Sequence, residues 1–533
     1  MAIAVEQNTG AEAHSLPLRV GEIWRKVRQF ITIEPVIVFY IFGVVCGTAF
    51  KVFEYEKACA AKLGYDLQVC EYFAKLEDDD ICEEPDDTNR TLPGVANFTE
   101  FRGLVCSAQQ ESTNEVVFLN SYRSIIVGIV QAVVLLFVGS WSDRVGLRKP
   151  CILVPIAADI VAFGVYIVCA IFMREISLEV SGIVPNIITA FSGGTPLVVT
   201  GIYSYLTVCT EEKDRTFRFA CTAVIYATVP IVANFFSGHL FKYFGFIKLC
   251  VLCIITDTIG LLYGLFVLKE PKELKDVEDP RNSDAPKTLS STTLGQLFDF
   301  SLVVDCVRVL LKKRDFNCRK ILYLTVLVYF INYGALGDAE SAAILAYVEF
   351  NWITNLGTWI SYDLLTTMMG TLLAMGVLSK RLGVSDAMIC VFSVCFSMIG
   401  KPIMAIAVST LKPYLYYVAT SIDLFEGSKI IAIRSIVSKL VGEDEIAKII
   451  AILGIVDSAQ VAIFPTIYST VYLKSQKFFI GTVFLLSEAF LLVSLGMYII
   501  LYLMSRRSNR NKAQAQSSAK QGIDNPAVDI TSL

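Results

Sequence analysis

GSWSDRVG, the stretch from Gly139 to Gly146, returns as GVLSKRLG from Gly376 to Gly383, and each copy lies between two long apolar runs. Both copies keep Gly, Ser, Arg and Gly at the same offsets. Self-similarity over such a distance indicates a chain built from two related halves. In membrane proteins, two related halves are typical of transporters, which bind their solute at the interface between the halves.

The composition is that of a membrane protein. Of the 533 residues, 54% are hydrophobic and only 18% are charged, and the mean hydropathy is +0.58. One soluble core of this size could not bury so much apolar surface. Because a helix of about 20 apolar residues crosses a bilayer, we predict an all-α membrane protein with twelve spans in two pseudo-repeated six-helix halves. The predicted spans are 33–53, 116–138, 151–173, 181–207, 217–241, 247–268, 321–347, 356–378, 386–408, 413–437, 448–472 and 479–504.

The segments between the spans divide the chain further. The linker begins with a charged, Pro-rich part that predicts a flexible segment. Its second part has apolar residues at helical spacing, which fits either an amphipathic helix on the membrane surface or a helix packed against the protein. The net charge of −4 argues against nucleic acid as a partner. The predicted units are an N-terminal tail (1–32), a first half (33–268) with a long loop (54–115), a linker (269–320), a second half (321–504) and a C-terminal tail (505–533).

Charge and modification signals predict the same topology. Lys and Arg are concentrated in both tails and in short loops on the same side, which by the positive-inside rule places the tails in the cytoplasm. The opposite side carries the acidic loop 54–115, with four cysteines and the only N-x-S/T sequons. Both features fit an oxidising lumen or cell exterior, and three disulfide connectivities are open. The sequons begin at Asn89 and Asn97, and the cysteines are Cys59, Cys70, Cys82 and Cys106.

A charge within a span is costly and marks either function or pairing. Arg434, in span 413–437, offers a planar fork that fits a carboxylate or phosphate. Asp423 and Glu426 precede it on the same face of a continuous helix, so internal pairing with one of them is the alternative. We leave both interpretations open, since each can hold at a different stage of a transport cycle.

Buried carboxylates can carry protons. Asp338 and Asp457 are therefore candidates for proton binding, and Arg123 is a candidate partner for either. The two histidines lie at the periphery, and no nucleotide loop, catalytic triad or zinc pattern is found, so we predict no enzyme activity, no cofactor and no metal site. The remaining charges of the spans are interpreted as helix-packing or interfacial residues: Asp159, Asp257, Asp363, Lys401 and Glu488.

The first copy of the repeated loop resembles a family motif. It matches G-x-x-x-D-R-x-G-R-R/K of the major facilitator superfamily, except that Leu147 replaces the usual first Arg. In that family the Asp and Arg of the motif latch spans across the cytoplasmic face in one state of the cycle. The resemblance implies transport by alternating access. The matching residues are Gly139, Asp143, Arg144, Gly146 and Arg148.

Two further stretches resemble the solute carrier 46 family, which includes the proton-coupled folate transporter. They are Asp214-Arg-Thr-Phe-Arg218 and Ile433-Arg434-Ser435-Ile-Val-Ser438-Lys439-Leu440-Val441, and the cysteine-bearing first loop adds to the resemblance. The family imports organic solutes, among them folates, antifolates and bacterial muropeptides. The resemblance implies that Arg434 takes part in binding and coupling.

This chain departs from the folate transporter at three points. A carboxylate that serves proton coupling there is Ala223 here, and a histidine of the seventh span is Asn332 here. These replacements argue against folate as the solute. The folate transporter also bridges its first loop to the loop between spans 7 and 8, but segment 348–358 has no cysteine here. The resemblance therefore implies that the four cysteines of the first loop pair among themselves.

The sequence thus predicts a secondary active transporter that imports a small organic anion, folate-like or muropeptide-like, with proton coupling left open. The alternative is a non-transporting receptor or sensor that keeps the same fold. Expected partners are the solute, membrane lipid and a PDZ-domain protein, because the chain ends in Thr531-Ser532-Leu533. We expect an integral membrane protein of the plasma membrane in preference to an endolysosomal membrane.

Overall fold

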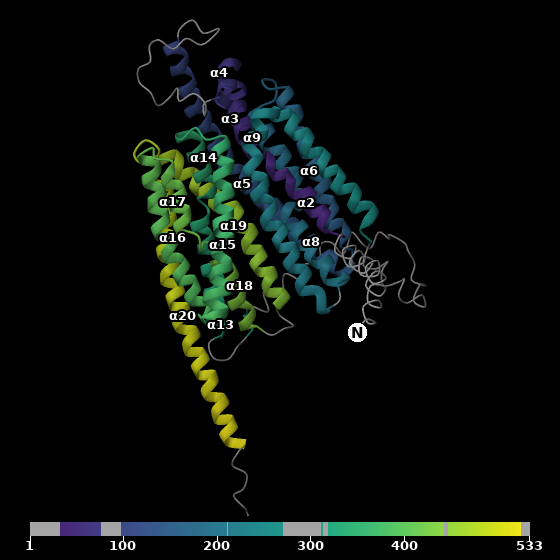
Figure 1. Ribbon diagram of the computed structural model, residues 1–533, viewed down its shortest axis with the longest axis vertical. Helices are drawn as coiled ribbons and strands as arrows, with labels where there is room; N and C mark the ends of the chain where they lie inside the picture. Colours follow the sequence, from purple (N-terminus) through teal and green to yellow (C-terminus); the bar gives the residue numbers. More distant parts are fainter. Residues whose placement is uncertain are drawn as a thin grey trace, which may run out of the picture.

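The computed structural model describes residues 32–75, 98–145, 147–210, 212–269, 311–312, 318–441 and 446–523, and these form helices without strands (Figure 1). The sequons, Cys82, the helix expected in the linker and the C-terminal PDZ signal lie outside these ranges. The elements of the first half are α2 (Glu34–Phe42), η1 (Gly43–Cys46), α3 (Gly47–Lys57), η2 (Ala58–Lys62), α4 (Leu67–Glu71), η3 (Tyr72–Lys75), α5 (Phe98–Val145), α6 (Lys149–Ile171), α7 (Leu178–Phe191), α8 (Gly194–Cys209) and α9 (Glu212–Val267). Those of the second half are α13 (Cys318–Leu336), α14 (Ala339–Glu349), α15 (Thr354–Leu373), η5 (Ala374–Arg381), α16 (Asp386–Ser409), α17 (Tyr414–Ile422), α18 (Ser428–Leu440), α19 (Ile446–Ser475) and α20 (Thr482–Ile523).

Ten helical stretches of the described residues are long and apolar enough to cross a membrane. One of these stretches, within α9, contains two of the predicted spans. The two spans are separated at Gly245, where the backbone leaves the helical region. The Arg218 guanidinium donates to the Thr210 hydroxyl at 3.2 Å, and the Tyr205 hydroxyl donates to the carbonyl of Lys269 at 3.1 Å. Both ends of α9 therefore lie beside the end of α8, and the chain reverses direction at Gly245.

The predicted span 413–437 is not one helix. It consists of α17 and α18, and residues 423–427 between them leave the regular helix. Asp423 and Gly427 explain the break, since both residue types are unfavourable in the interior of a helix. Neither piece is long enough to be counted as a membrane-crossing helix by itself.

Every third span of the predicted series is interrupted. The first changes to a 3₁₀ helix at η1, the fourth breaks between α7 and α8, the seventh between α13 and α14, and the tenth between α17 and α18. At the second of these breaks Gly193 and Gly194 both have positive φ, 86° and 53°, which glycine adopts without strain. Interrupted helices in transporters place backbone and side-chain polar groups near the middle of the membrane.

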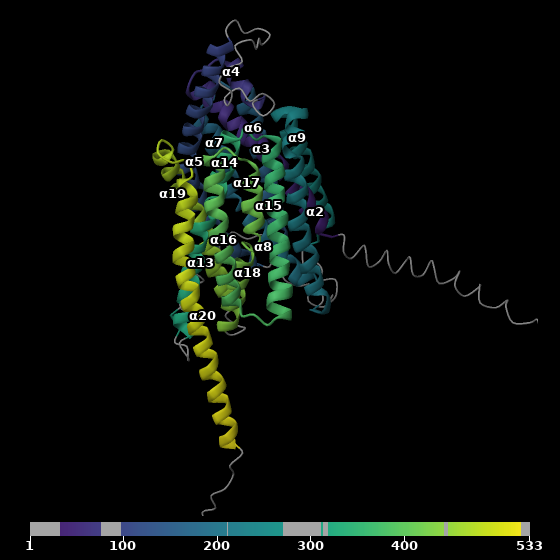
Figure 2. The same ribbon diagram turned by 60° about the vertical axis from the view of Figure 1, so that its left-hand side comes forward.

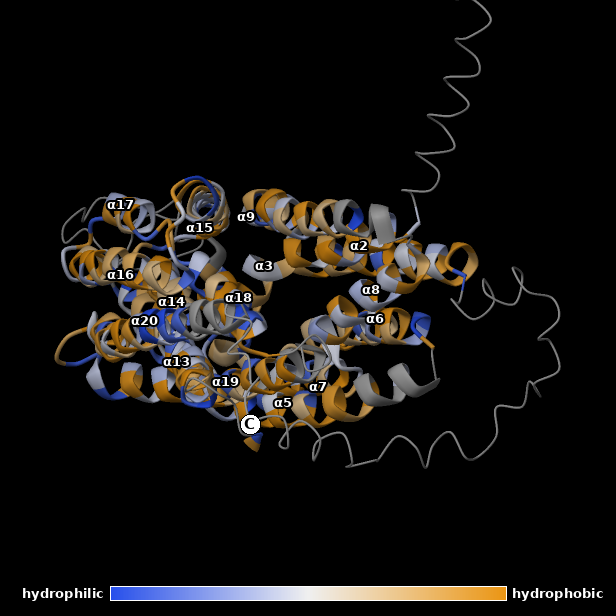
Figure 3. Cartoon of the chain, turned by 90° about the horizontal axis from the view of Figure 1, so that it is seen from below, coloured by the Kyte–Doolittle hydropathy of each residue, from blue (hydrophilic) through white to orange (hydrophobic). Residues whose placement is uncertain are grey.

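The two halves pack against each other along two seams, α5 with α19 and α9 with α15 (Figure 3). Small residues permit this close approach. A Cβ atom on Gly128 of α5 would lie 2.7 Å from the Cβ of Ala462 in α19. A Cβ atom on Gly357 of α15 would lie 2.3 Å from the carbonyl oxygen of Asn234 in α9. The described residues thus form two helical bundles that pack closely along these two seams.

We call the end of the molecule that carries α4 the loop face, and the end from which α20 projects the tail face (Figures 1 and 2). At the loop face, Cys59 and Cys70 form a disulfide, and Cys106 is also disulfide-bonded. The first bridge confirms that two of the four loop cysteines pair with each other. Nearby, the buried ammonium of Lys57 donates to the carbonyls of Cys169, Phe172 and Met173.

The two copies of the repeated loop lie between corresponding helices. The first lies where α5 ends at Val145 and α6 begins, and the second lies where η5 ends and α16 begins. Gly383, the last residue of the second copy, has φ 67°. Arg148 of the first copy donates to the Ser142 hydroxyl at 3.1 Å, and this hydroxyl donates to the carbonyl of Leu147. The side chains of Asp143 and Arg144, and all of Gly146, lie outside the described part, so the gating role predicted for them stays a prediction.

Candidate functional site

Arg434 of α18 pairs with Asp457 of α19, and α19 packs against α5 of the first half. In Figure 3, α18 lies on the side of its bundle that faces the first half. The Arg434 guanidinium lies 3.3 Å from a carboxylate oxygen of Asp457 and donates to the Tyr329 hydroxyl at 3.3 Å. Tyr329 donates in turn to the other Asp457 oxygen at 2.7 Å and lies 3.1 Å from the Tyr333 hydroxyl. The Arg434 side chain is 53% exposed, so its guanidinium is open to a ligand on its free side.

The predicted pairing of Arg434 with Asp423 or Glu426 is wrong. That prediction assumed a continuous helix, in which both carboxylates would share the face of Arg434. The break at residues 423–427 ends the helical periodicity, so Arg434 pairs with Asp457 of α19. Three elements, α13, α18 and α19, thereby meet at one polar contact.

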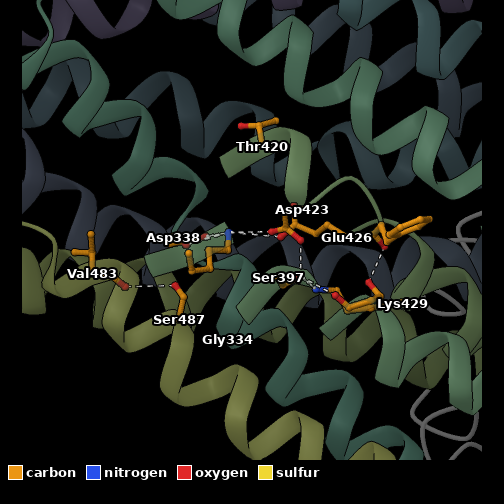
Figure 4. A network of polar contacts seen from close by, with 12 residues as sticks. Gly334, Asp338, Ser397, Thr420, Asp423, Glu426, Lys429, Val483 and Ser487 are labelled. Carbon is orange, nitrogen blue, oxygen red and sulfur yellow. Dashed lines mark hydrogen bonds and ion pairs between the residues drawn. The ribbon is translucent and has the colours of Figure 1, made fainter. Parts of the chain in front are cut away.

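A second group of charges is buried inside the second half around Lys401 of α16 (Figure 4). The Lys401 nitrogen lies 3.1 Å from both oxygens of Asp338, 3.6 Å from Glu426 and 3.8 Å from Asp423. Asp338 precedes α14 at the break of the seventh span, and the other two carboxylates lie in the break of the tenth. Both interrupted spans therefore direct acidic side chains to one ammonium group.

A second lysine completes this group. Lys429, which is fully buried in α18, donates to the Ser397 hydroxyl at 2.9 Å, and Ser397 donates to Asp423 at 2.5 Å. We name Asp338, Lys401, Asp423, Glu426 and Lys429 the Lys401 cluster. All but Glu426, whose side chain is 19% exposed, are almost completely buried. Burial of this many charges in a membrane protein is costly and marks function or obligatory pairing.

Sequence reasoning selected the three carboxylates of the cluster but not its lysines. The sequence predicts a packing or interfacial role for Lys401, whereas it lies at the centre of the cluster. It gives no functional prediction for Lys429. The available signal was the excess of unpaired carboxylates within the spans of one half, which requires buried cations nearby.

Arg123 does not pair with Asp338 or Asp457, so that prediction is wrong. It contacts Glu54 and Asn120 of its own half, and it lies 4.0 Å from Glu340 of α14. Asn120 also donates to Glu340 at 3.1 Å. The position of Arg123 along α5 explains these partners, because this part of α5 faces α3 and α14 near the loop face.

We name Glu54, Asn120, Arg123 and Glu340 the loop-face latch, since it joins the two halves. Two neighbouring contacts reinforce it. The rings of Tyr55 and Tyr347 stack with centroids 4.6 Å apart, and the Gln109 amide donates to the Asn351 side-chain oxygen at 3.3 Å. The halves are therefore held together at the loop face by ionic, polar and aromatic contacts.

Asn332 is completely buried in α13, and within the described part of the chain its amide group has no hydrogen-bond partner. A buried amide without partners costs about 1 to 3 kcal/mol. The next residue, Tyr333, is part of the polar contact at Arg434 through Tyr329. Asn332 therefore remains a candidate for solute contact, but it does not join either charged group in this state.

The fold and the buried charges define a membrane transporter. The model of the Major Facilitator Superfamily matches residues 121–465, and the chain belongs to this family. It is therefore a secondary transporter and a multi-pass membrane protein, not an enzyme.

Similar proteins confirm the resemblance to the solute carrier 46 family. The chain is 23% identical over 487 residues to the lysosomal proton-coupled steroid conjugate and bile acid symporter of Gallus gallus, covering 88% of this chain and 93% of that protein. It is 24% identical over 301 residues to solute carrier family 46 member 2 of Mus musculus, covering 54% and 61% of the two chains.

The similarity to solved structures concerns the fold only and says nothing about the solute. The peptide transporter POT in complex with sulfate matches with a TM-score of 0.54 and 12% identity, over 91% of this chain and 95% of that one. The human organic anion transporter MFSD10 matches with a TM-score of 0.50 and 12% identity, over 90% of this chain and 99% of that one.

Proposed function

We propose that the protein imports a small organic anion by alternating access and that Arg434 binds the anionic group of the solute. The observation that supports this most directly is the half-exposed Arg434 guanidinium, held by one carboxylate and carried by α18, which lies on the side of its bundle toward the first half. A guanidinium presents its donors in a fork that matches a carboxylate, sulfate or phosphate. The solute would take the place of Asp457 at Arg434.

Displacement of Asp457 would also suit proton symport. Once its guanidinium partner is occupied by the solute, Asp457 is left with the neutral hydroxyls of Tyr329 and Tyr333. A carboxylate deprived of its cation in a membrane interior binds a proton more readily. Solute and proton would then enter together, and both would leave when Asp457 and Arg434 meet again.

We propose amphipathic organic anions, such as steroid conjugates or bile acids, as the first solutes to test. This proposal rests on the name of the similar Gallus gallus protein and on the tyrosines beside Arg434, which offer apolar rings to a steroid nucleus. Folate-like and muropeptide-like solutes, which the sequence also suggested, belong in the same panel. Ala223 and Asn332 argue against folate itself.

Uptake into proteoliposomes tests the proposal. Purified protein is reconstituted, and entry of a radiolabelled steroid sulfate, bile acid, folate or muramyl dipeptide is measured with the exterior at pH 5.5 or 7.4 and the interior at 7.4. We expect uptake of at least one organic anion above empty liposomes, and faster uptake at pH 5.5. Saturable binding of an anion without flux would instead support the receptor or sensor alternative.

We propose that the loop face is lumenal or extracellular, that the tails are cytoplasmic, and that Asn89 and Asn97 carry glycans.

The fold does not determine which cellular membrane carries the protein. The similar protein is named lysosomal, which does not favour the plasma membrane over an endolysosomal one. We therefore propose that the protein lies in a membrane that borders an acidic lumen or exterior. The proton gradient across such a membrane is directed toward the cytoplasm.

Glycosidase treatment of the protein from animal cells is expected to lower its apparent mass in two steps, one for each sequon. Asn89→Gln and Asn97→Gln each remove one step, and Asn114→Gln, which alters an asparagine of α5 outside any sequon, serves as the control. An unchanged mass after treatment of the unaltered chain would contradict the proposed orientation of the loop.

A further inference from the structure

One short segment takes part in both the Lys401 cluster and the loop-face latch. Asp338 and Glu340 are separated by a single residue at the junction of α13 and α14. Asp338 is held by Lys401, within its own half, at 3.1 Å. Glu340 accepts a hydrogen bond from Asn120 and faces Arg123, both in the other half. The junction therefore connects a buried charge group directly to the contact that closes the loop face.

The junction is closely packed, so a change at Asp338 has few ways to relax locally. The Tyr468 hydroxyl of α19 donates to the carbonyl of Gly334 at 2.7 Å. A Cβ atom on Gly337 would lie 2.8 Å from the Tyr468 ring. On the other side, Asp338 is the residue just before α14, and the Ala342 amide of α14 donates to its carbonyl at 2.7 Å. Movement of Asp338 away from Lys401 would therefore carry Glu340 with it.

The charges of the Lys401 cluster do not balance when every group is ionised. Three carboxylates, Asp338, Asp423 and Glu426, face the ammonium groups of Lys401 and Lys429. One negative charge is left over, and a net charge buried in a membrane protein is costly. The other titratable groups that face the cluster supply no cation: Asp363 of α15, Tyr416 of α17, Tyr468 of α19 and Glu488 of α20.

We propose that the Lys401 cluster binds one exchangeable proton and that its binding opens the loop-face latch. Proton binding neutralises Asp338, which loses its ionic contact with Lys401. The junction is released, Glu340 moves away from Arg123 and Asn120, and the halves separate at the loop face. The proposal rests on the proton symport proposed above, and it assigns to the cluster the coupling role that Ala223 cannot have.

A second pair of carboxylates within the spans, of which Asp257 is buried and Asp159 partly buried, is the rival site. Asp159 and Asp257 lie in the first half near Tyr40, and one oxygen of Asp257 has no hydrogen-bond partner within the described residues. Nothing that the structure describes connects this pair to the loop-face latch. We therefore assign the latch to the Lys401 cluster and use Asp257→Asn as the matched control.

The test measures opening of the loop face without any transported solute. Ser112→Cys places a thiol on the buried stripe of α5 between Gln109 and Asn120, which both contact the other half. Its rate of reaction with a maleimide is measured on full-length protein in nanodiscs at pH 5.5 and 7.5. Because thiol reactivity itself depends on pH, each rate is divided by that of Asp66→Cys, whose side chain is 73% exposed at the loop face. The unaltered chain gives the background from native cysteines.

The expected result is a normalised rate that is about threefold or more higher at pH 5.5 than at 7.5. Asp338→Asn should react at the fast rate at both pH values, and Asp257→Asn should keep the parent's ratio. Glu426→Gln, which removes the surplus charge at the more exposed edge of the cluster, should reduce the ratio and serves if Asp338→Asn does not fold. A parent ratio near one, an unchanged ratio in both cluster variants, or loss of the ratio in Asp257→Asn would each overturn the proposal. Failure of solute uptake leaves this result intact, so the two proposals fail separately.

Discussion

Lys401→Met is expected to destabilise the protein more than any other single substitution in the second half. The methionine has similar length but no charge, so Asp338, Asp423 and Glu426 lose their shared cation in a buried setting. Breaking a buried ion pair from one side costs about 3 to 5 kcal/mol. We expect a marked loss of folded protein in fluorescence-detected size-exclusion chromatography, together with a lower midpoint of thermal unfolding.

Two comparisons separate this effect from a general loss of positive charge. Lys62→Met removes a lysine that pairs with Glu179 on an exposed surface, where ion pairs contribute about 0 to 1 kcal/mol. It should leave the unfolding midpoint nearly unchanged. Adding Asp338→Asn to Lys401→Met should restore part of the stability, because one uncompensated carboxylate is removed. Equal midpoints for Lys401→Met and the unaltered chain would mean that Lys401 is not the common cation of the cluster.

The sequence predicted the features that depend on local composition. Long apolar runs predicted the membrane helices, and the repeated loop predicted the two halves and the family that the comparisons confirm. The apolar runs and each single copy of the loop are local signals, because each consists of residues adjacent in the chain. The loop cysteines were predicted to pair among themselves only by resemblance, and the Cys59–Cys70 bridge agrees with that.

The partners of the buried charges could not be predicted in the same way. Helical periodicity assigned Asp423 and Glu426 to Arg434, but it holds only while the helix is continuous, and the tenth span breaks between them. The sequence does not show which charges of different spans lie together, so it predicts a packing or interfacial role for Lys401 although three carboxylates surround it. Partner choice depends on the depth and rotation of each helix, which the hydropathy of a span does not encode.

The two charged groups of the second half differ in a way that suits different tasks. The Lys401 cluster is buried and has no open side for an organic solute, whereas the Arg434 guanidinium is half exposed. The break that brings Asp423 and Glu426 to Lys401 also sets the start of α18, which carries Arg434. A change in the cluster could therefore alter the orientation of Arg434, so solute binding and proton binding need separate variants.

Arg434→Lys is expected to lower the apparent affinity for the transported anion while the protein still reaches the membrane. Lysine keeps the positive charge but lacks the second donor of the guanidinium fork. Loss of one charge-assisted hydrogen bond costs roughly 1.5 to 3 kcal/mol, which corresponds to an apparent affinity about ten- to a hundredfold lower. Uptake of the organic anion identified in proteoliposomes, measured over a range of concentrations, gives this value. Lys439→Arg, which alters another cation of α18 that pairs with Asp386, is the matched control and should keep normal affinity.

A double variant decides whether Arg434 binds the solute or only neutralises Asp457. If neutralisation is its whole role, the damage in Arg434→Ala comes from an unpaired Asp457 carboxylate, and adding Asp457→Asn should restore uptake. If Arg434 binds the anion, the double variant stays inactive, because removal of Asp457 supplies no cation for the solute. We expect the second result, and we expect Asp457→Asn alone to keep anion binding while the dependence of uptake on the proton gradient weakens, because the Lys401 cluster still binds its proton. Normal affinity in Arg434→Lys together with full recovery in the double variant would remove Arg434 from the binding site.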